Sequence, residues 1–525
     1  MKGCLSAVVS KLSVLLTDQT ARAAATLRTV FSLPQREPLD RVFARTDVEQ
    51  LHRLRSSEAD AVIDEVTWHD LMLDQYHAEL SQQVSIFGQQ ALYRRLRAGG
   101  GDADAIAVEQ LMANPAELKR LHRACTSLRH ADTEIAALLH EDAAPVLPRW
   151  AGKTWLLMLI LVASIAAAAF SPAGWIVTGI VLYTMIAVQM RYSSRMEAWQ
   201  EKLNSLQMLL RVTTLLGRPD AGGAGKLNRK LTRPPIHSVP FLREYIDWFM
   251  LGNVNHYHKT VALVFANAAL LRRCYGEVSH IEADVALARH LLAAPVFCRA
   301  VTAQAPIAMI DAVHPLLPQA QPLTLALKEK GAFISGQNGI GKSTLLRTVG
   351  LNLVAARAFG FCYARSARVP GLPVYTSMQS EDSLLARESL YMAELRRAQE
   401  LLAAASGPHP GVYIIDEIFR GTNHVESVSA AASVLDVLAA KGLVIVSSHN
   451  LVLAPLLAHR LDPLCVAHDA AGMLTLAPGV LAHTNGIALL AQRGFGHEVE
   501  TGAAKVFDWL SEYLSHPADG GKVLA

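Results

Sequence analysis

Residues 332–344 read AFISGQNGIGKST, and this stretch decides the fold of the C-terminal part of the chain. The apolar run at its start is typical of a buried strand, and the segment TLLRTVGLNLVAARAF from Thr344 onward is typical of a helix. Between them, Gly336 to Ser343 fits the pattern G-x-x-x-x-G-K-[ST] at every position. A strand, a glycine-rich loop and a helix in this order predict a phosphate-binding loop in a parallel α/β domain.

The loop supplies three kinds of group for a bound nucleotide. Glycines let backbone N–H groups approach phosphate, and the start of the following helix favours negative charge. Lys342 should reach the β- and γ-phosphates, and the Ser343 hydroxyl should ligate Mg²⁺. The predicted nucleotide-binding residues of the loop are Gly336, Gln337, Asn338, Gly339, Ile340, Gly341, Lys342, Ser343 and Thr344.

Two later apolar runs end in polar residues that suit the same site. The run VYIIDE ends in Asp416, which could hold Mg²⁺ through water, and in Glu417, which could polarise the attacking water. The alternative is a strand that ends in a solvated acidic turn. The run GLVIVSSHN delivers His449 to the edge where parallel sheets bind ligands, a place that suits a γ-phosphate sensor. An isolated histidine is otherwise a common surface or core residue.

Composition bounds the remaining possibilities. A length of 525 residues allows two to four domains of about 100–200 residues each. The net charge of +3 argues neither for nor against nucleic acid, whereas the apolar share of 51% favours some membrane content. The six cysteines form no C-x-x-C pair and therefore indicate unpaired thiols in a reducing compartment. The N-terminal apolar run is interrupted by Lys11 and lacks a clean cleavage site, so we expect no signal peptide.

A second stretch, TWLLMLILVASIAAAAFSPAGWIVTGIVLYTMIAVQM at residues 154–190, contains no charged residue. Ser171-Pro172 divides it into two segments, each near the lower limit for crossing a hydrocarbon core of about 30 Å as a helix. Tryptophans near the ends and flanking cations favour a transmembrane hairpin with both flanks in the cytoplasm. The alternative is a pair of buried core helices. The flanking cations are Arg149, Lys153, Arg191 and Arg195.

The rest of the chain reads as helical up to about residue 304. Apolar residues recur every three or four positions before the hairpin and predict a buried helical stripe. The basic, Gly- and Pro-rich segment 217–237 predicts a solvated loop, with contact to lipid phosphate or nucleic acid as the alternative. Asp102 and Asp104 suit the start of a helix. The residues of the stripe are Leu71, Leu80, Val84, Phe87, Ala91 and Leu92.

The motifs GQNGIGKST, DEIFRGTN and SSHN, in this order, resemble the ATPase domain of the MutS family. The family's patterns are GPNxxGKST, DExGRGTS and a T-H pair. DSLLARESLYMAELRRAQELL is similar to the family's D-x-L-x-x-G-x-S-T-F-M-x-E-M segment, and HTNGIALLAQRGF is similar to its S-Y-G-I-x-V-A-x-x-A-G helix. The resemblance covers about residues 305–495, and SIFGQQALYRRLR at 85–97 weakly resembles the start of the family's lever helices.

The resemblance implies a C-terminal P-loop ATPase domain of ABC type that binds ATP and Mg²⁺ and works as a homodimer. His314 and Pro315 match the family's H-P stretch and would lie near the adenine. Ser389 would act in trans on the partner's nucleotide, unless it only begins a helix. Arg420-Gly421-Thr422 would form the loop that crosses the dimer interface. Glu417, His449, Lys342 and Ser389 are thus the predicted catalytic residues, and Ser343 and Asp416 the metal ligands.

Departures from the family pattern define a subgroup. No F-x-E precedes the lever-like helices, so the mismatch-reading domain is expected to be absent, and the apolar hairpin interrupts the lever region. Asn423 replaces the usual serine. The chain thus resembles a membrane-anchored bacterial MutS-like protein, placed in the inner membrane with its ATPase in the cytoplasm. The fold class is α plus α/β. The predicted domains are a helical region with the start of the levers at 1–150, the hairpin at 151–192, a second lever part at 193–304, the ATPase domain at 305–515 and a tail at 516–525.

Three functions follow from these features. The leading one is a Mg-ATP hydrolase whose dimer closes on ATP and moves its levers like a clamp, with DNA as the ligand that the family implies. An ABC-type transporter ATPase is the second, although the chain has no L-S-G-G-Q and the hairpin offers no charged lining for a path. A membrane scaffold that nucleotide switches without DNA binding is the third.

Overall fold

The fold is described from a computed structural model of the chain. The described residues are 42–55, 63–140, 147–233, 246–247, 250–303, 307–378, 390–408, 410–420, 423–470, 472–481 and 497–514. Elements in these ranges are a helical part up to residue 293 and two β-sheets with their helices after it. The chain is therefore a mixed helical and α/β protein, as the sequence predicts.

A six-stranded sheet forms the centre of the C-terminal part, with strand order β11-β10-β4-β9-β8-β7. Every neighbouring pair in it is parallel except β10 with β11. The mainly parallel sheet predicted from the apolar runs is thus present. The bounds are β4 Gly331–Gly336, β7 Val374–Ser377, β8 Val412–Asp416, β9 Leu443–Ser447, β10 Leu461–His468 and β11 Leu474–Pro478.

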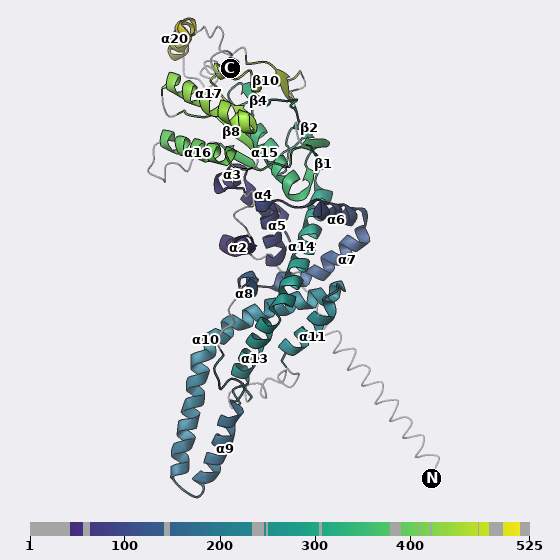
Figure 1. Ribbon diagram of the computed structural model, residues 1–525, viewed down its shortest axis with the longest axis vertical. Coiled ribbons are helices and arrows are strands. Elements are labelled where there is room, and N and C mark those ends of the chain that lie inside the picture. Colours follow the sequence, from purple (N-terminus) through teal and green to yellow (C-terminus); the bar gives the residue numbers. More distant parts are fainter. Residues whose placement is uncertain are drawn as a thin grey trace, which may run out of the picture. The chain divides into compact units, whose positions relative to one another are not determined.

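Helices cover both faces of this sheet. Alternate residues of β8 join different hydrophobic clusters: Tyr413 and Ile415 pack with one, and Val412 and Ile414 with the other. Strands that are covered on both sides need apolar residues at every position, which explains the continuous apolar runs. Figure 1 shows α16 (Leu390–Ala405) and α17 (His424–Lys441) side by side on one face. Helix α15 (Lys342–Phe359) belongs to the cluster of the other face.

A second, five-stranded sheet has the order β3-β2-β6-β1-β5. Only β1 and β6 are parallel in it, and the other pairs are antiparallel. The sequence analysis does not predict this sheet, because its strands are short and only partly buried. The bounds are β1 Cys298–Thr302, β2 Ala308–Ala312, β3 Leu323–Ala326, β5 Phe361–Cys362 and β6 Ser366–Val369.

The helical part is built around α14 (Ala268–Ala293), which packs against α5, α6 and α7. The six residues of the predicted stripe are all buried, but they do not lie on one helix. The chain turns at residues 81–85, because Gln83 takes a left-handed conformation and Ser85 caps the next helix. The bounds are α2 Arg45–Arg55, α3 Glu65–Asp70, α4 Leu73–Leu80, α5 Ile86–Ala98, α6 Asp102–Ala113, α7 Pro115–Cys125, η1 Thr126–His130 and α8 Ala136–His140.

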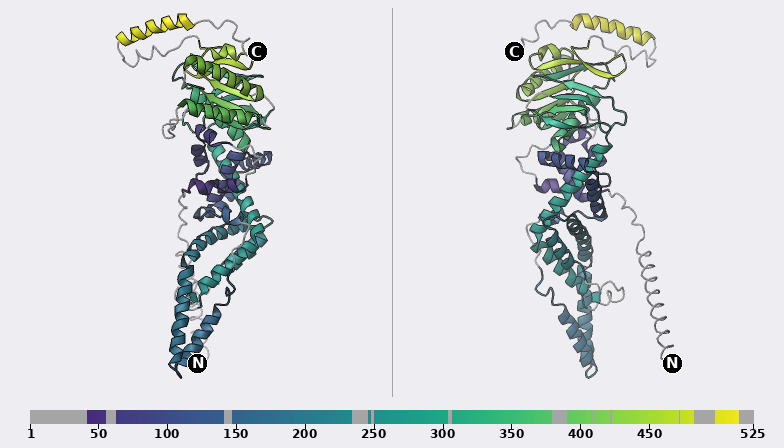
Figure 2. Two further views of the ribbon diagram at one scale, coloured as in Figure 1. Left: turned by 60° about the vertical axis from the view of Figure 1, so that its left-hand side comes forward. Right: turned by 90° about the vertical axis from the view of Figure 1, so that its right-hand side faces the viewer.

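The apolar stretch forms a helical hairpin, α9 (Trp155–Ala168) and α10 (Ala173–Leu216), which run beside each other in both views of Figure 2. Among the described helices, α10 alone is long and apolar enough to cross a membrane, and α9 is a shorter apolar helix. Only 22% of the most apolar window of α10 is buried. Helix α10 continues without a break through the predicted domain boundary at residues 192–193.

One expectation for the helical part is wrong. Residues 221–231 of the basic segment form a helix, α11 (Ala221–Leu231), and not a loop. Ala224, Leu227 and Leu231 recur at helical spacing and are buried, with α11 packed against α10. This tertiary contact outweighs the poor helix propensity of three glycines in the segment. Helix α13 (Gly252–Ala266) follows in the chain.

Candidate nucleotide-binding site

The phosphate loop joins the buried strand β4 to the first turn of α15. Gly339 has φ +76° and Gly341, the residue before α15, has φ +103°. Side chains rarely adopt these angles, so glycine at both positions lets the loop turn back over the helix start. The loop residues 337–339 are exposed. The N–H groups of the first turn of an 18-residue helix are thus presented at an open loop, as a phosphate site requires.

Lys342 lies folded against this loop. Its Nζ donates hydrogen bonds to the carbonyl oxygens of Gly336, at 3.0 Å, and Gln337, at 3.2 Å. Burial lowers the pKa of Lys342, while the nearby charges of Glu417 and Asp416 act in the opposite direction. A lysine held by backbone carbonyls and faced by two carboxylates is positioned to exchange those partners for phosphate oxygens.

Asp416 ends strand β8 and is held by the neighbouring strand. The Ser447 hydroxyl of β9 donates a hydrogen bond to Asp416 Oδ1, and the two residues are partners in the parallel register. The carboxylate is buried, since Asp416 is 7% exposed. Ser447 therefore fixes the orientation of the predicted metal ligand. The sequence analysis missed this role, because a serine inside an apolar run gives no signal of its partner.

Glu417 lies directly after β8 in a strained backbone conformation. Its φ is +59° and that of Phe419 is +56°, although neither residue is glycine. Such strain costs of order 1–3 kcal/mol per residue and persists only where the surroundings hold it. Here the Glu417 N–H donates to the Ser447 carbonyl at 2.9 Å. This hydrogen bond helps to hold the Glu417 backbone beside the end of β9.

The side chains of Glu417 and His449 form a direct pair. His449 Nε2 lies 2.9 Å from Glu417 Oε1, so the structure brings these two predicted residues together. Burial alone would raise the pKa of Glu417, but the hydrogen bond with His449 and the charges of His449, Arg420 and Lys342 lower it below its usual value. Glu417 is therefore an ionised carboxylate at neutral pH and can accept a hydrogen bond from water.

A further arginine and glutamate extend this pair toward helix α16. Arg420 Nε lies 3.2 Å from Glu417 Oε2, and the Arg420 backbone N–H donates to Glu394 Oε2 at 2.9 Å. The sequence analysis gave Glu394 no role. Its signal was present in the M-x-E pattern of the segment DSLLARESLYMAELRRAQELL, where Glu394 follows Met392 by two residues.

The site fits Mg²⁺ only in combination with a nucleotide. In the part of the chain that the structure describes, no group of three or more His, Cys, Asp or Glu side chains could hold a metal ion. Ser343 in the first turn of α15 and Asp416 at the end of β8 are oxygen donors of the type that Mg²⁺ prefers. A cation held by two protein oxygens completes its coordination with phosphates and water, as P-loop proteins do.

His314 lies in a different environment from the loop. It is 3% exposed, and its Nδ1 accepts a hydrogen bond from the Leu316 N–H at 3.3 Å. Burial, aided by the charge of Arg347, lowers its pKa to about 4. With Pro315 it lines a cavity of about 370 Å³ that none of residues 336–344 line. The predicted contact of His314 and Pro315 with adenine therefore stays a prediction.

Three predicted residues fall outside the described part of the chain. These are Ser389, Gly421 and Thr422, so the structure gives no position for the residue predicted to act in trans or for the tip of the predicted interface loop. Asn423, which replaces the family's serine, is described. Its side chain caps α17 by accepting a hydrogen bond from the Glu426 N–H at 2.9 Å.

The six-stranded sheet is joined to the helical part by buried polar contacts. Asp70 at the end of α3 accepts hydrogen bonds from the Thr376 hydroxyl, at 2.7 Å, and the Met378 N–H, at 2.9 Å. Arg397 of α16 donates to the Thr376 carbonyl and to Asp64, the cap of α3. Asp70 and Arg397 therefore link α3 to β7 and α16.

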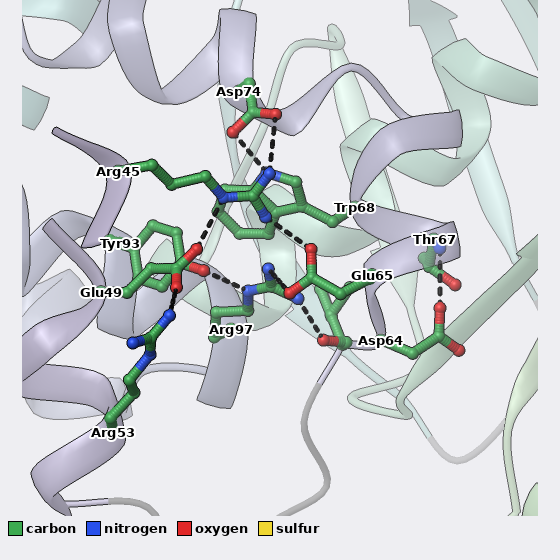
Figure 3. A network of polar contacts seen from close by, with 11 residues as sticks. Arg45, Glu49, Arg53, Asp64, Glu65, Thr67, Trp68, Asp74, Tyr93 and Arg97 are labelled. Carbon is green, nitrogen blue, oxygen red and sulfur yellow. Dashed lines mark hydrogen bonds and ion pairs between the residues drawn. The ribbon is translucent and has the colours of Figure 1, made fainter. Parts of the chain in front are cut away.

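Helix α3 is in turn fixed to α2 and α5 by the network in Figure 3. Arg45 contacts carboxylates of both α2 and α3, Glu49 and Glu65. Arg97 of α5 also contacts Glu65 and lies 4.2 Å from the centre of the Trp68 ring. The sequence analysis missed this network and the Asp70 contact, because their partners come from distant segments.

Fold and site together define the class of P-loop nucleotide-binding domains. The features of this class are a parallel sheet, a Gly-Lys-Ser loop between β4 and a helix, and acidic residues at the end of β8, which lies two positions from β4 in the sheet. Residues 332–499 match the family model described as MutS domain V. This match contains the loop, Asp416, Glu417 and His449. Through this domain the chain is similar to proteins of the MutS family.

Several curated relatives are similar over the same part. A protein named endonuclease MutS2 from Thermus thermophilus is 33% identical over 172 residues, which are 32% of this chain and 22% of the relative. The DNA mismatch repair protein MutS of Thermus aquaticus is 28% identical over 185 residues, 34% of this chain and 23% of the relative. The mismatch repair protein msh3 of Botryotinia fuckeliana is 30% identical over 180 residues, 32% of this chain and 16% of the relative. The chain spans about a fifth of the length of these relatives.

Proposed function

We propose that this chain is a membrane-anchored, Mg-dependent ATP hydrolase that dimerises through its ATPase domains. The observation that carries the hydrolase part is the Glu417–His449 pair, held beside Asp416 and the phosphate loop. Because MutS-family proteins are ATPases, the family assignment supports the same activity. An ionised carboxylate in contact with a histidine, next to a metal ligand, is the arrangement that water activation needs.

Each residue has a distinct task in this proposal. The loop N–H groups and Lys342 hold the phosphates, while the Ser343 hydroxyl and Asp416 hold the metal. Bound Mg²⁺ would supply neutralisation of the charge that develops on the phosphates. Glu417 accepts a hydrogen bond from the attacking water and so orients it for attack in line. His449 keeps Glu417 in position and reports the presence of the γ-phosphate.

The substitution Glu417→Gln tests the hydrolase part. It keeps the shape of the side chain but removes the charged acceptor, so phosphate release should fall by about 10²- to 10⁴-fold while ATP binding is retained. Glu329→Gln is the matched control, because Glu329 is an exposed residue of the same domain just before β4. Unchanged phosphate release in Glu417→Gln would overturn the assignment of this residue. ATP binding without release in the unmodified protein would favour the nucleotide-switched scaffold instead.

The dimer and its ligand form a second part of the proposal. In this part Ser389 of each protomer completes the partner's site, and closure moves α3 through the Asp70 and Arg397 contacts. Two of the relatives are named DNA mismatch repair proteins, which supports DNA as the ligand of the levers. Cross-linking in the presence of ATP would test the dimer. Binding of duplex, mismatched and branched DNA over a salt series would test the ligand, since phosphate contacts weaken with salt.

Membrane anchoring is supported by the surface of the hairpin. Large apolar side chains of α9 and α10 are exposed, among them Leu159 at 56%, Ile176 at 67% and Ile180 at 60%. A core helix would bury such residues, whereas only 22% of the most apolar window of α10 is buried. Between the two helices the Ser164 and Thr178 hydroxyls are 2.9 Å apart, and Thr178 also donates to the Gly174 carbonyl. Polar groups are thus satisfied inside the hairpin, as a lipid environment demands.

A double substitution on the exposed face tests anchoring without touching the core. Ile176→Asp with Ile180→Asp should release the protein into the soluble fraction, because a carboxylate at the centre of a span costs about 2.5–3.5 kcal/mol. Ile180 lies near the centre of the apolar part of α10, and Ile176 lies one turn closer to its start. The control is Val499→Asp with Val506→Asp on α20 (His497–Leu514), where both valines are also exposed. Resistance of the hairpin variant to alkaline extraction, equal to that of the control, would contradict the proposal.

The proposed location is the cytoplasmic membrane of a bacterium, with the ATPase domain and the helical part in the cytoplasm. The proposed division is 1–150 and 193–304 for the helical lever part, 151–192 for the hairpin, 305–515 for the ATPase domain and 516–525 for a tail. Helix α10 runs unbroken from the hairpin into the second lever part. In this proposal, a movement of the lever part would therefore also move the hairpin. Protease digestion of sealed vesicles of either orientation would test the topology.

A further inference from the structure

A cavity of about 490 Å³ lies where the first turns of α9 meet α13. Trp155, Met158 and Leu159 of α9 form an apolar wall. Arg233 and Lys259 contribute cationic side chains. The cavity therefore combines an apolar side and a charged side within reach of one small ligand. It lies apart from the nucleotide site, and no residue of that site lines it.

The apolar wall is continuous with the exposed face of the hairpin. Trp155 is 55% exposed and Leu159 is 56% exposed, and the exposed residues Ile160 and Val162 follow along the same helix. An acyl chain that lies along α9 would cover this surface. A ligand whose polar end lies in the cavity can thus extend its apolar part along the helix.

The charged side carries an excess of positive charge. Arg233 is paired with Asp247, at 3.0 Å, so these two charges largely balance. Lys259 is exposed, and no residue in the described ranges forms an ion pair with it. An ammonium group without a carboxylate beside an apolar wall attracts an anion that is attached to an apolar chain.

Asn255 supplies a third feature of the cavity. Its Nδ2 donates to the Thr154 hydroxyl and to the Met250 carbonyl, which ties α13 to the start of α9. Its Oδ1 is buried and receives no hydrogen bond from any described residue. Buried acceptors are normally satisfied, so a hydroxyl of a bound ligand is a suitable donor for this oxygen.

We propose that this cavity binds the headgroup of an anionic phospholipid, with its phosphate at Lys259 and its acyl chains along α9. The proposal rests on the membrane anchoring proposed above, which places the cationic base of the hairpin at the cytoplasmic surface. Basic pockets at this depth bind anionic headgroups. A soluble phosphate compound would use Lys259 but would leave the apolar wall in contact with water, so the amphiphile is the better fit.

The test uses the full chain in vesicles of phosphatidylcholine that contain an equal fraction of brominated phosphatidylglycerol or brominated phosphatidylcholine. Bromine quenches tryptophan fluorescence at short range, and the difference between the unmodified protein and Trp155→Phe isolates Trp155. We expect the brominated anionic lipid to be enriched at Trp155 about fivefold over the zwitterionic one, the effect of one cation near the surface. Lys259→Gln should abolish this preference.

Arg191→Gln is the matched control. Arg191 is an exposed cation on α10 that does not line the cavity, so its removal should keep the preference. Equal quenching by the two lipids, or equal loss in both variants, would overturn the lipid site while the anchor stands. Competition by free glycerol phosphate would also overturn it, in favour of a soluble anion. Failure of the protein to float with any vesicle would overturn the membrane anchoring. Flotation measures membrane association and quenching measures lipid preference, so the two failures can be told apart.

Discussion

Strand β8 and residues 173–190 of helix α10 are both apolar, but many of their side chains lie in opposite environments. Tyr413, Ile414 and Ile415 of β8 are 0% exposed, whereas Ile176 and Ile180 of α10 are 67% and 60% exposed. Both regions avoid water by composition. In β8 other protein atoms replace the water, while in this part of α10 the protein buries only some side chains, such as Val181 and Met185. Apolar composition therefore predicts burial, but the fold decides which apolar side chains other protein atoms cover.

Polar residues differ between the two regions in the same way. At the end of β8, Asp416 accepts a hydrogen bond from Ser447 of β9, and Glu417 contacts His449 and Arg420. In the hairpin, Ser164 and Thr178 satisfy each other, and no charge is present between residues 154 and 190. One region is the candidate nucleotide-binding site and the other is an exposed apolar surface. The predictions that follow test this contrast.

The largest effect is expected from an aspartate placed in β8. Ile414→Asp buries an unpaired carboxylate between two helical layers and should destabilise the ATPase domain by more than about 4 kcal/mol. Ile176→Asp alone should change the free energy of unfolding of that domain by no more than about 0.5 kcal/mol, because residue 176 lies on the surface of the protein. Thermal unfolding in detergent measures both. Equal destabilisation by the two substitutions would show that Ile176 is packed in a core, and it would contradict the contrast between buried β8 and the exposed face of α10.

The second prediction separates chemistry from anchoring. Lys342→Ala removes the cation of the phosphate loop and should lower kcat/KM for ATP by about 10²- to 10³-fold, the usual effect of losing one group that stabilises developing charge. Membrane retention should not change. Phosphate release and alkaline extraction, measured on the same preparation, check the two halves. A loss of membrane retention in this variant would show that the two regions are not independent.

The third prediction concerns pH and the helical part. Glu282 of α14 caps α5 by accepting hydrogen bonds from the N–H groups of Ser85 and Gly88, at 2.9 and 3.0 Å. Burial raises its pKa to about 7, above the value of 4.5 that it has when exposed. Below pH 4.5 the carboxyl is protonated in both states. As pH rises toward 7 only the unfolded chain releases the proton, so stability is lost over this window.

Glu282→Gln should remove this dependence. The unfolding free energy of the unmodified protein, relative to the variant, should fall by about 1–3 kcal/mol between pH 4.5 and 8. Asp284, whose pKa burial raises to about 6, shifts in the same direction in both proteins and cancels in the difference. A difference that stays constant across this range would contradict the assignment to Glu282.

The smallest effect is expected at two helix caps, one beside the six-stranded sheet and one in the helical part. Asn423 caps α17 and Asn114 caps α7, each through a side-chain oxygen that accepts an N–H hydrogen bond. Replacement of either by alanine should cost about 1 kcal/mol. Hydrogen exchange would locate the loss, which should be confined to α17 in one variant and α7 in the other. A loss spread over both helices would mean that the regions unfold as one unit.

The sequence predicted the ATPase part better than the helical part. Strand–loop–helix order, the Gly-Lys-Ser loop and the acidic end of β8 all follow from residues that are neighbours in the chain. The loop predicted at residues 221–231 was wrong, since α11 depends on contact with α10. The stripe from Leu71 to Leu92 was buried as predicted but broken by Gln83 and the Glu282 cap of Ser85. The five-stranded sheet was missed because its strands are short and pair with strands that lie far away in the chain.

By itself, the sequence determined where the phosphate loop lies, which residues end the parallel strands and where an uncharged stretch interrupts the helices. These features are local, because backbone geometry and side-chain type act over a few residues. Only the tertiary structure decided that Glu417 meets His449 and Arg420, that Asp70 ties α3 to the ATPase sheet, and that the hairpin leaves its apolar side chains exposed. Those contacts join segments far apart in the chain, and their energies depend on distance and burial, which no local pattern encodes.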